Sequence, residues 1–99
     1  MHPSKILADA LPSEIQAAMG LALLRLKNRD RLHLDDLVHV MGLSSKQSAA
    51  NYISGTTKMT ATCWLKATAR WPELHDMMIA ELDEAEKAAS AKQRTLKLA

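Results

Sequence analysis

The chain has 99 residues, which is enough for one compact domain and too few for two. Hydrophobic residues make up 47% of it, charged residues 24% and aromatic residues 3%, a composition that excludes low-complexity chains and disfavours β-sandwiches and barrels. The formal net charge is only +2, but basic and acidic residues are unevenly distributed along the sequence.

Helix-favouring residues dominate the composition and predict an all-α fold. The first residues lack a strong pattern, so we expect a flexible arm over 1–12. A first helix is expected over 13–28, because apolar residues recur there at helical spacing and because Ser13 and Gln16 form a capping-box signature. Gly20 lowers helix propensity in the middle of this helix, which indicates close approach of another helix.

Two short helices joined by a glycine turn are expected next. The first spans 34–41 and has two aspartates in its first turn, where the helix dipole favours negative charge. Gly42 is placed to end it in a left-handed conformation. Ser44 and Ser45 are both good N-caps for the second short helix, which is expected over 46–53.

Two further helices complete the predicted fold. Thr60 is expected to cap a fourth helix, which Pro72 ends, and a fifth helix starts at Pro72 or Glu73. The apolar residues of the fifth helix form a narrow seam that suits packing against one partner helix: Leu74, Met78, Leu82, Ala85 and Ala89. Because this seam exceeds what a four-helix core needs, we expect a homodimer. Its predicted interface residues are Leu74, Met78, Leu82 and Ala85.

Charge is segregated along the sequence. Between Asp36 and Glu73 there is no acidic residue, whereas four basic residues lie in that interval. A second basic run extends from Arg25 to Arg31, and we interpret it as a solvated helix end rather than as a phosphate clamp. Segregation of this kind indicates a surface that binds a polyanion, although a buried middle segment that is poor in charge would give the same pattern.

The segment 34–71 contains the order of short helix, glycine turn and short helix that is typical of a helix-turn-helix. Leu43, after the glycine, is expected to plug the core. In the second short helix Ala49, Tyr52 and Ile53 are expected to form the buried stripe. The opposite face is then free to enter a DNA major groove, which is about 12 Å wide.

This stretch resembles the Cro/repressor-type, lambda-repressor-like helix-turn-helix family of small phage and plasmid regulators. The resemblance rests on Leu34-Asp35-Asp36-Leu37, Met41-Gly42-Leu43-Ser44, Asn51-Tyr52-Ile53-Ser54-Gly55 and Lys58. It implies a dimeric DNA-binding domain, here a five-helix bundle with a C-terminal oligomerisation helix. The expected base contacts are Lys46, Gln47, Ser48, Ala50 and Asn51. The expected phosphate contacts are Ser44, Thr56, Thr57 and Lys58.

The spacing of two glycines departs from the family pattern. Gly42 and Gly55 are thirteen positions apart, where the family usually has twelve. Without an extra residue in the turn, Ser48 and Asn51 would lie on the buried stripe, which disfavours polar side chains. We therefore expect one extra turn residue, which buries Ala49 instead.

No constellation in the sequence indicates catalysis, a cofactor or a metal site. The four histidines are scattered, Cys63 is the single cysteine, and no Ser/His/Asp grouping or glycine-rich loop is present. We expect neither enzyme activity nor a cofactor or metal ion. Trp64 and Trp71 fall at helical spacing and are expected in the core.

The expected organisation is an arm over 1–12, a DNA-binding domain over 13–71 and a dimerising helix over 72–99. The expected function is binding of double-stranded DNA at an inverted-repeat site by a cytoplasmic, homodimeric transcriptional regulator, since no signal pattern or membrane span is visible. The alternative is a protein-interaction module that binds an RNA polymerase subunit, a nuclease or another regulator, or a phage packaging-type adaptor built on a helix-turn-helix. Steep salt dependence would distinguish a DNA binder from these.

Overall fold

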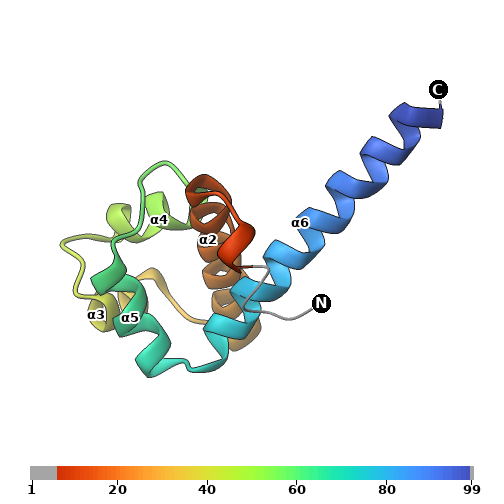
Figure 1. Cartoon of the computed structure of the whole chain (residues 1–99). Coiled ribbons are helices and arrows are strands. Elements are labelled where there is room, and N and C mark those ends of the chain that lie inside the picture. Colours follow the sequence, from red (N-terminus) through yellow and green to blue (C-terminus); the bar gives the residue numbers. More distant parts are fainter. Residues whose placement is uncertain (1–6, 99) are drawn as a thin grey trace.

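The computed structural model in Figure 1 describes residues 7–98, with side chains up to residue 88. Within these residues a helical turn over 7–9 precedes five longer α-helices. They are α2 (Pro12–Asp30), α3 (Leu34–Met41), α4 (Lys46–Ser54), α5 (Ala61–Arg70) and α6 (Glu73–Leu98). Residues 7–98 contain no β-strand, so the all-α prediction is confirmed. None of these helices has the length and apolarity that crossing a membrane requires.

Local signals set most of the helix ends. Gly42 and Gly55 follow α3 and α4 directly and adopt left-handed conformations, with φ of 68° and 79°. The hydroxyls of Ser45 and Thr60 each accept a backbone N–H three residues further on, at 3.2 Å, and so cap α4 and α5. The boundaries predicted for these helices therefore agree with the structure to within one residue.

The start of α2 differs from the prediction. Leu11, not Ser13, is the N-cap residue, and Pro12 is the first helical residue. Proline suits this position because the N–H that it lacks has no partner within the helix there. The Glu14 carboxylate accepts the N–H of Leu11 at 3.0 Å, so the local cap is made by Glu14 and Gln16 is left for another contact.

Part of the expected N-terminal arm packs onto the domain. Residues 7–9 form a helical turn, and Leu7 and Ala10 lie half-buried against the hydrophobic core. Residues 1–6 of the predicted arm lie outside the described part of the chain. The segment from Leu7 onward therefore belongs to the folded body rather than to a detached arm.

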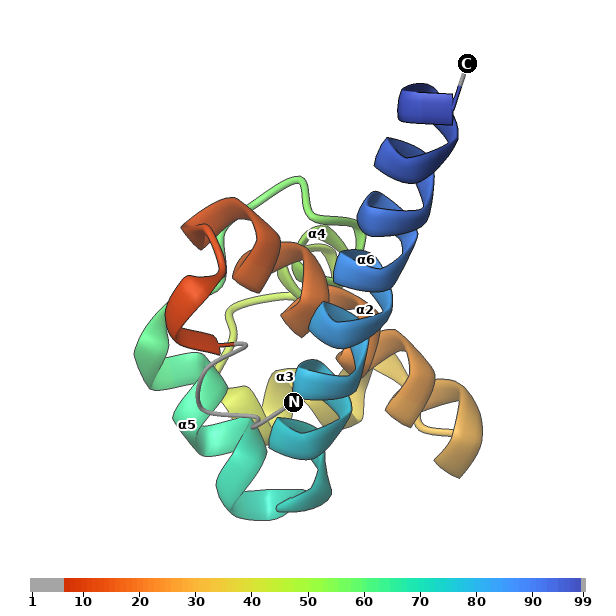
Figure 2. The same cartoon turned by 45° about the vertical axis from the view of Figure 1, so that its right-hand side comes forward.

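The core lies where α2, α3, α5 and α6 meet (Figures 1 and 2). Helix α2 packs against α6 and α4, while α3 packs against α4 and α5. The largest side chains that are fully enclosed are Leu23, Leu26, Leu37, Met41 and Leu74. Trp71 is buried as predicted, but Trp64 is only half-buried at the edge of the core. No polar or charged side chain is buried among the described residues.

Gly20 allows α4 to approach α2 closely. A Cβ at this position would lie 2.8 Å from the carbonyl oxygen of Tyr52 and 3.0 Å from that of Ile53. Both oxygens belong to the backbone of α4, so rotation of a side chain could not relieve the clash. The close helix approach predicted from this glycine is confirmed.

The seam of α6 is used inside the protomer. Leu74, Met78 and Leu82 are 0%, 2% and 4% exposed, because they belong to the core that α6 shares mainly with α2. Leu74 and Met78 are therefore not available for the dimer interface predicted from the sequence, and Leu82 presents only a small edge to solvent. Of the other two seam residues, Ala85 is exposed, and the side chain of Ala89 is outside the described part.

Candidate nucleic-acid interface

A four-residue turn, Gly42 to Ser45, connects α3 to α4. Leu43 is half-buried and packs against the core, as predicted for the residue after the glycine. Ser44 is exposed, and its hydroxyl lies 3.5 Å from that of Ser48 in the first turn of α4. The turn thus places a cluster of hydroxyl groups at the N-terminus of α4.

Helix α4 has an apolar side toward the protein and a polar side toward solvent. Ala49 is 1% exposed, and Tyr52 and Ile53 are half-buried against the core. The expected base contacts stay accessible: Lys46 and Gln47 are exposed, and Ser48, Ala50 and Asn51 are half-buried. The centre of the buried side is therefore Ala49, as the register with one extra turn residue requires.

Two amide side chains lie together on the outer side of α4. The Nε2 of Gln47 donates to the Oδ1 of Asn51 at 2.9 Å. After donating one hydrogen, a primary amide still has a second N–H and its carbonyl oxygen. Gln47 therefore keeps the adjacent donor and acceptor that the edge of an adenine requires.

The first lysine of α4 lies near a carboxylate of α3. The Nζ of Lys46 is 3.5 Å from the Oδ2 of Asp35, and both side chains are about two-thirds exposed. A pair this exposed contributes little to stability, so Lys46 can exchange Asp35 for another anion at small cost. With Lys27, His33 and Leu34, the pair lines an open cleft of about 310 Å³.

The polar loop after α4 is tied to the end of that helix. Thr56, Thr57 and Lys58 are all exposed. The N–H groups of Thr56 and Thr57 donate to the carbonyl of Asn51 at 3.0 and 3.3 Å, and the hydroxyls of Ser54 and Thr56 are 2.8 Å apart. The expected phosphate contacts are thus held beside the C-terminus of α4.

Gln16 anchors the same loop from α2, a contact that the sequence did not reveal. Its Nε2 donates to the carbonyl of Met59 at 2.9 Å, and its Oε1 accepts the Met59 N–H at 2.7 Å. The two residues are 43 positions apart, so no local spacing could identify the pair. The sequence analysis had instead paired Gln16 with Ser13, because their spacing matches a capping box.

Lys66 is a second residue that the sequence analysis did not assign to the site. It is exposed on α5, and its Nζ lies beside the turn, 3.1 Å from where a Cβ of Gly42 would stand. The sequence feature that could have indicated Lys66 is the absence of acidic residues between Asp36 and Glu73. Lys66 therefore adds a cation beside the turn between α3 and α4.

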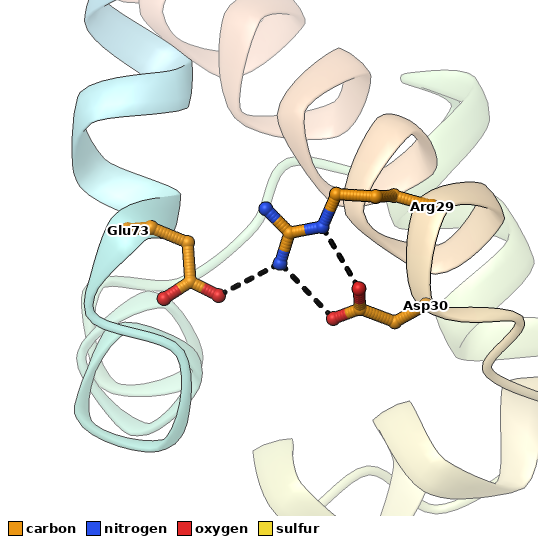
Figure 3. A network of polar contacts seen from close by, with 3 residues as sticks. All are labelled: Arg29, Asp30 and Glu73. Atoms are coloured by element: carbon orange, nitrogen blue, oxygen red, sulfur yellow. Dashed lines mark hydrogen bonds and ion pairs between the residues drawn. The ribbon is translucent and has the colours of Figure 1, made fainter.

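The basic run of α2 contacts α6. Arg25 forms an ion pair with Glu81. Figure 3 shows Arg29 between Asp30 and Glu73, at 2.8 and 2.9 Å. The interpretation of this run as a solvated helix end is therefore incomplete, because Arg25 and Arg29 join α2 to the acidic part of α6.

The ion pairs around Arg29 shift the titration of both carboxylates. The side-chain hydrogen bonds from Arg29 hold the pKa of Asp30 below its ordinary value. The largest effect on Glu73 is the hydrogen bond from its own backbone N–H, which lowers its pKa. The side-chain hydrogen bond from Arg29 lowers this pKa further. Both carboxylates are thus stabilised in their charged form by the folded arrangement.

Other kinds of site have little support in the described part of the chain. No group of three or more His, Cys, Asp or Glu side chains within it is placed to hold a metal ion, and Cys63 is a half-buried free thiol. Comparisons of the chain with protein-family models, curated proteins and solved structures find no match. The geometry of α4 and its neighbours is therefore the basis for assigning a function.

Proposed function

We propose that the protein binds double-stranded DNA sequence-specifically, with α3 and α4 as a helix-turn-helix and α4 as the recognition helix. The observation that carries this proposal is the two-sided character of α4, in which Ala49 is buried and the amides of Gln47 and Asn51 lie together on the outer side. A single helix fits the major groove, and amide side chains read base edges there. The resemblance of segment 34–71 to Cro/repressor-type regulators supports the same function.

The charge around α4 supports a polyanionic partner. Lys46, Lys58 and Lys66 are exposed on α4, on the loop after it and on α5. The sequence from 37 to 72, which includes all of α4 and α5, contains no acidic residue. Exposed cations attract phosphates and release their counterions on binding, and Lys46 would exchange its exposed partner Asp35 for a phosphate.

The proposed contacts divide into base and phosphate contacts. Gln47 and Asn51, with Ser48, Ala50 and Lys46 around them, would lie along the groove floor. Hydroxyls and ammonium groups at the two ends of α4 would meet the backbone: Ser44, Thr56, Thr57, Lys58 and Lys66. Bound as a homodimer at an inverted repeat, such a protein would act as a transcriptional regulator, and RNA polymerase or another regulator would be a further partner.

Selection of bound sequences from a random duplex pool tests this function, followed by affinity measurements across a salt series. Gln47→Ala should relax the preference at one or two base positions, at a cost of about 1–3 kcal/mol of discrimination. Lys58→Ala should weaken all sequences alike and lower the salt slope by about one. Lys87→Ala, which removes the same charge from α6, is the matched control and should leave the selected sequence unchanged.

Two outcomes would contradict the proposal. The first is a pool that shows no enrichment, together with weak binding at low salt. The second is binding to a protein partner that stays constant as salt rises, because an apolar interface lacks the counterion release of a phosphate contact. The second result would favour the protein-interaction module.

A further inference from the structure

The C-terminal part of α6 extends beyond the globular body (Figures 1 and 2). Leu82 is the last core residue of this helix, and residues 84–88 are all exposed. The helix nevertheless continues to Leu98, which adds roughly 22 Å at 1.5 Å per residue. A helical segment of this length is marginal in water without packing, so contact with a partner would stabilise it.

Charge changes sign along this projecting segment. Residues 81–86 include four acidic side chains and no basic one, whereas residues 87–97 include four basic side chains and no acidic one. Two parallel copies of such a helix would place like charges side by side. Two antiparallel copies would place the basic half of each helix beside the acidic half of the other, which is favourable.

The apolar spacing has its centre at Ala89, within one helical turn of the change of charge between Glu86 and Lys87. Leu82, Ala89 and Leu96 follow one another at intervals of seven residues, so they occupy the same register position on α6. A two-fold axis at Ala89 places position 96 of one copy at the level of position 82 of the other. Charge and apolar spacing are separate features of the sequence, and both specify this register.

An open groove lies beside α6 at the level of Leu82. It has a volume of about 170 Å³ and is lined by Asp9, Ala10, Glu14, Leu82 and Glu86. Three of these residues are acidic, and Ala10 and Leu82 are the apolar part of the lining. The groove therefore suits a helix that combines an apolar residue with basic ones, which is the composition of residues 92–97.

We propose that a second copy of this chain pairs with the projecting part of α6 in an antiparallel, two-fold arrangement centred on Ala89. This register puts position 96, a leucine, of each copy at the level of Leu82 of the other, and position 92, a lysine on the same face as position 96, at the level of Glu86. The same surface is used on both copies, as in most symmetric dimers. The interface is distinct from the residues Leu74 and Met78, which complete the core of the protomer.

Charge reversal tests this arrangement by sedimentation of the full chain without DNA. The wild-type protein should be a dimer at micromolar concentration. Glu86→Lys and Lys92→Glu should each raise the dissociation constant by about tenfold or more, because each places like charges together in both halves of the dimer. A one-to-one mixture of the two variants should dimerise again, because each unlike pair is then restored.

Glu84→Lys is the matched control, since position 84 is two residues from both Leu82 and Glu86 and lies on the opposite side of the helix. It changes the net charge equally and should leave the dimer intact. Leu96→Asp should give monomers with a lower helix content by circular dichroism, because the projecting segment then lacks its partner, while the thermal unfolding of the globular body stays unchanged. A monomeric wild-type protein, or variants that associate normally or stay monomeric when mixed, would overturn the proposal. Because the assay contains no DNA, its result is separate from that of the DNA-binding test.

Discussion

Asn51 is the residue at which the two possible registers of α4 differ most. Its side chain is half-buried and accepts a hydrogen bond from Gln47, while Ala49 occupies the buried centre. Asn51→Ala should therefore change the free energy of unfolding by no more than about 0.5 kcal/mol, as at most surface positions. It should relax the base preference in a selection experiment. Loss of folding with an unchanged preference would show that the proposed recognition helix is displaced by one residue.

Gly20 is the residue that sets the distance between α2 and α4. Gly20→Ala gains up to about 1 kcal/mol of helix propensity, but overpacking against a backbone costs about 1–3 kcal/mol. Since the Cβ would stand 2.8 Å from the Tyr52 carbonyl oxygen, we expect a net loss of stability in urea unfolding. Ala17→Gly, at an exposed position of α2, measures the difference in helix propensity between alanine and glycine without a packing contribution. A Gly20→Ala protein more stable than the wild type would contradict the close contact.

At the scale of elements, Gln16 connects α2 to the loop that carries the proposed phosphate contacts. Gln16→Ala leaves the N–H and carbonyl of the buried Met59 without these partners, at a cost of about 1–3 kcal/mol. Hydrogen exchange at Thr56 and Thr57 should become faster. Gln16→Glu keeps the acceptor for the Met59 N–H and should have a smaller effect. Equal exchange in all three proteins would show that Gln16 does not hold the loop.

The contact between α2 and α6 should depend on pH. The folded pKa values of Asp30 and Glu73 are lower than their ordinary values of 3.8 and 4.5, so the unfolded chain takes up protons first as pH falls. The stabilisation is complete above about pH 4.5 and is lost as pH falls through the lower, folded pKa values. Thermal unfolding between pH 3 and 7 measures this loss, and Arg29→Gln should reduce it. An equal pH dependence in both proteins would argue against the ion pairs.

Elements were predictable where the signal is local. Gly42, Gly55, Ser45 and Thr60 act on residues within one turn of themselves, so the ends of α3, α4 and the start of α5 follow from the sequence. The start of α2 was misplaced because Pro12 and Glu14 made a competing local cap. Local patterns thus determine helix limits but leave open which of two nearby caps is used.

Partners between elements were much less predictable. The spacing of Leu74, Met78 and Leu82 indicates a buried seam, but burial against α2 and burial against a second copy give the same pattern. Contacts of Arg29 with Glu73 and of Lys66 with the turn at Gly42 join residues far apart in sequence. Of the candidate site, the polar face of α4 could therefore be predicted, whereas the residues that anchor and surround it required the structure.

At the scale of the whole molecule, two surfaces lie apart. Figure 1 shows α6 projecting away from the side of the globule that carries α3, α4 and α5. The basic, acid-free segment from 37 to 72 and the projecting end of α6 can therefore act at the same time. In the proposed dimer through α6, α4 of each copy would stay uncovered, and a two-fold axis would relate the two α4 helices.

The proposed symmetry predicts the form of the proposed DNA site. Two recognition helices related by a two-fold axis bind an inverted repeat, with half-site centres a whole number of helical turns apart, about 10 or 20 base pairs. Inserting about 5 base pairs turns one half-site to the opposite face of the duplex, so affinity should fall to that of a single half-site, and a further 5 should partly restore it. Gel-shift titration of such a spacing series measures this.

The dimer variant provides the control for the spacing series. Glu86→Lys leaves the face of α4 unchanged, so it should bind a single half-site like the wild type and lose the additional affinity for the full repeat. Effective concentration is the reason, because the second half-site is bound intramolecularly only when the two protomers are joined. An affinity that is independent of spacing in the wild type would show that the protomers bind separately. A preference for a direct repeat would exclude the two-fold arrangement and leave base recognition by α4 in place.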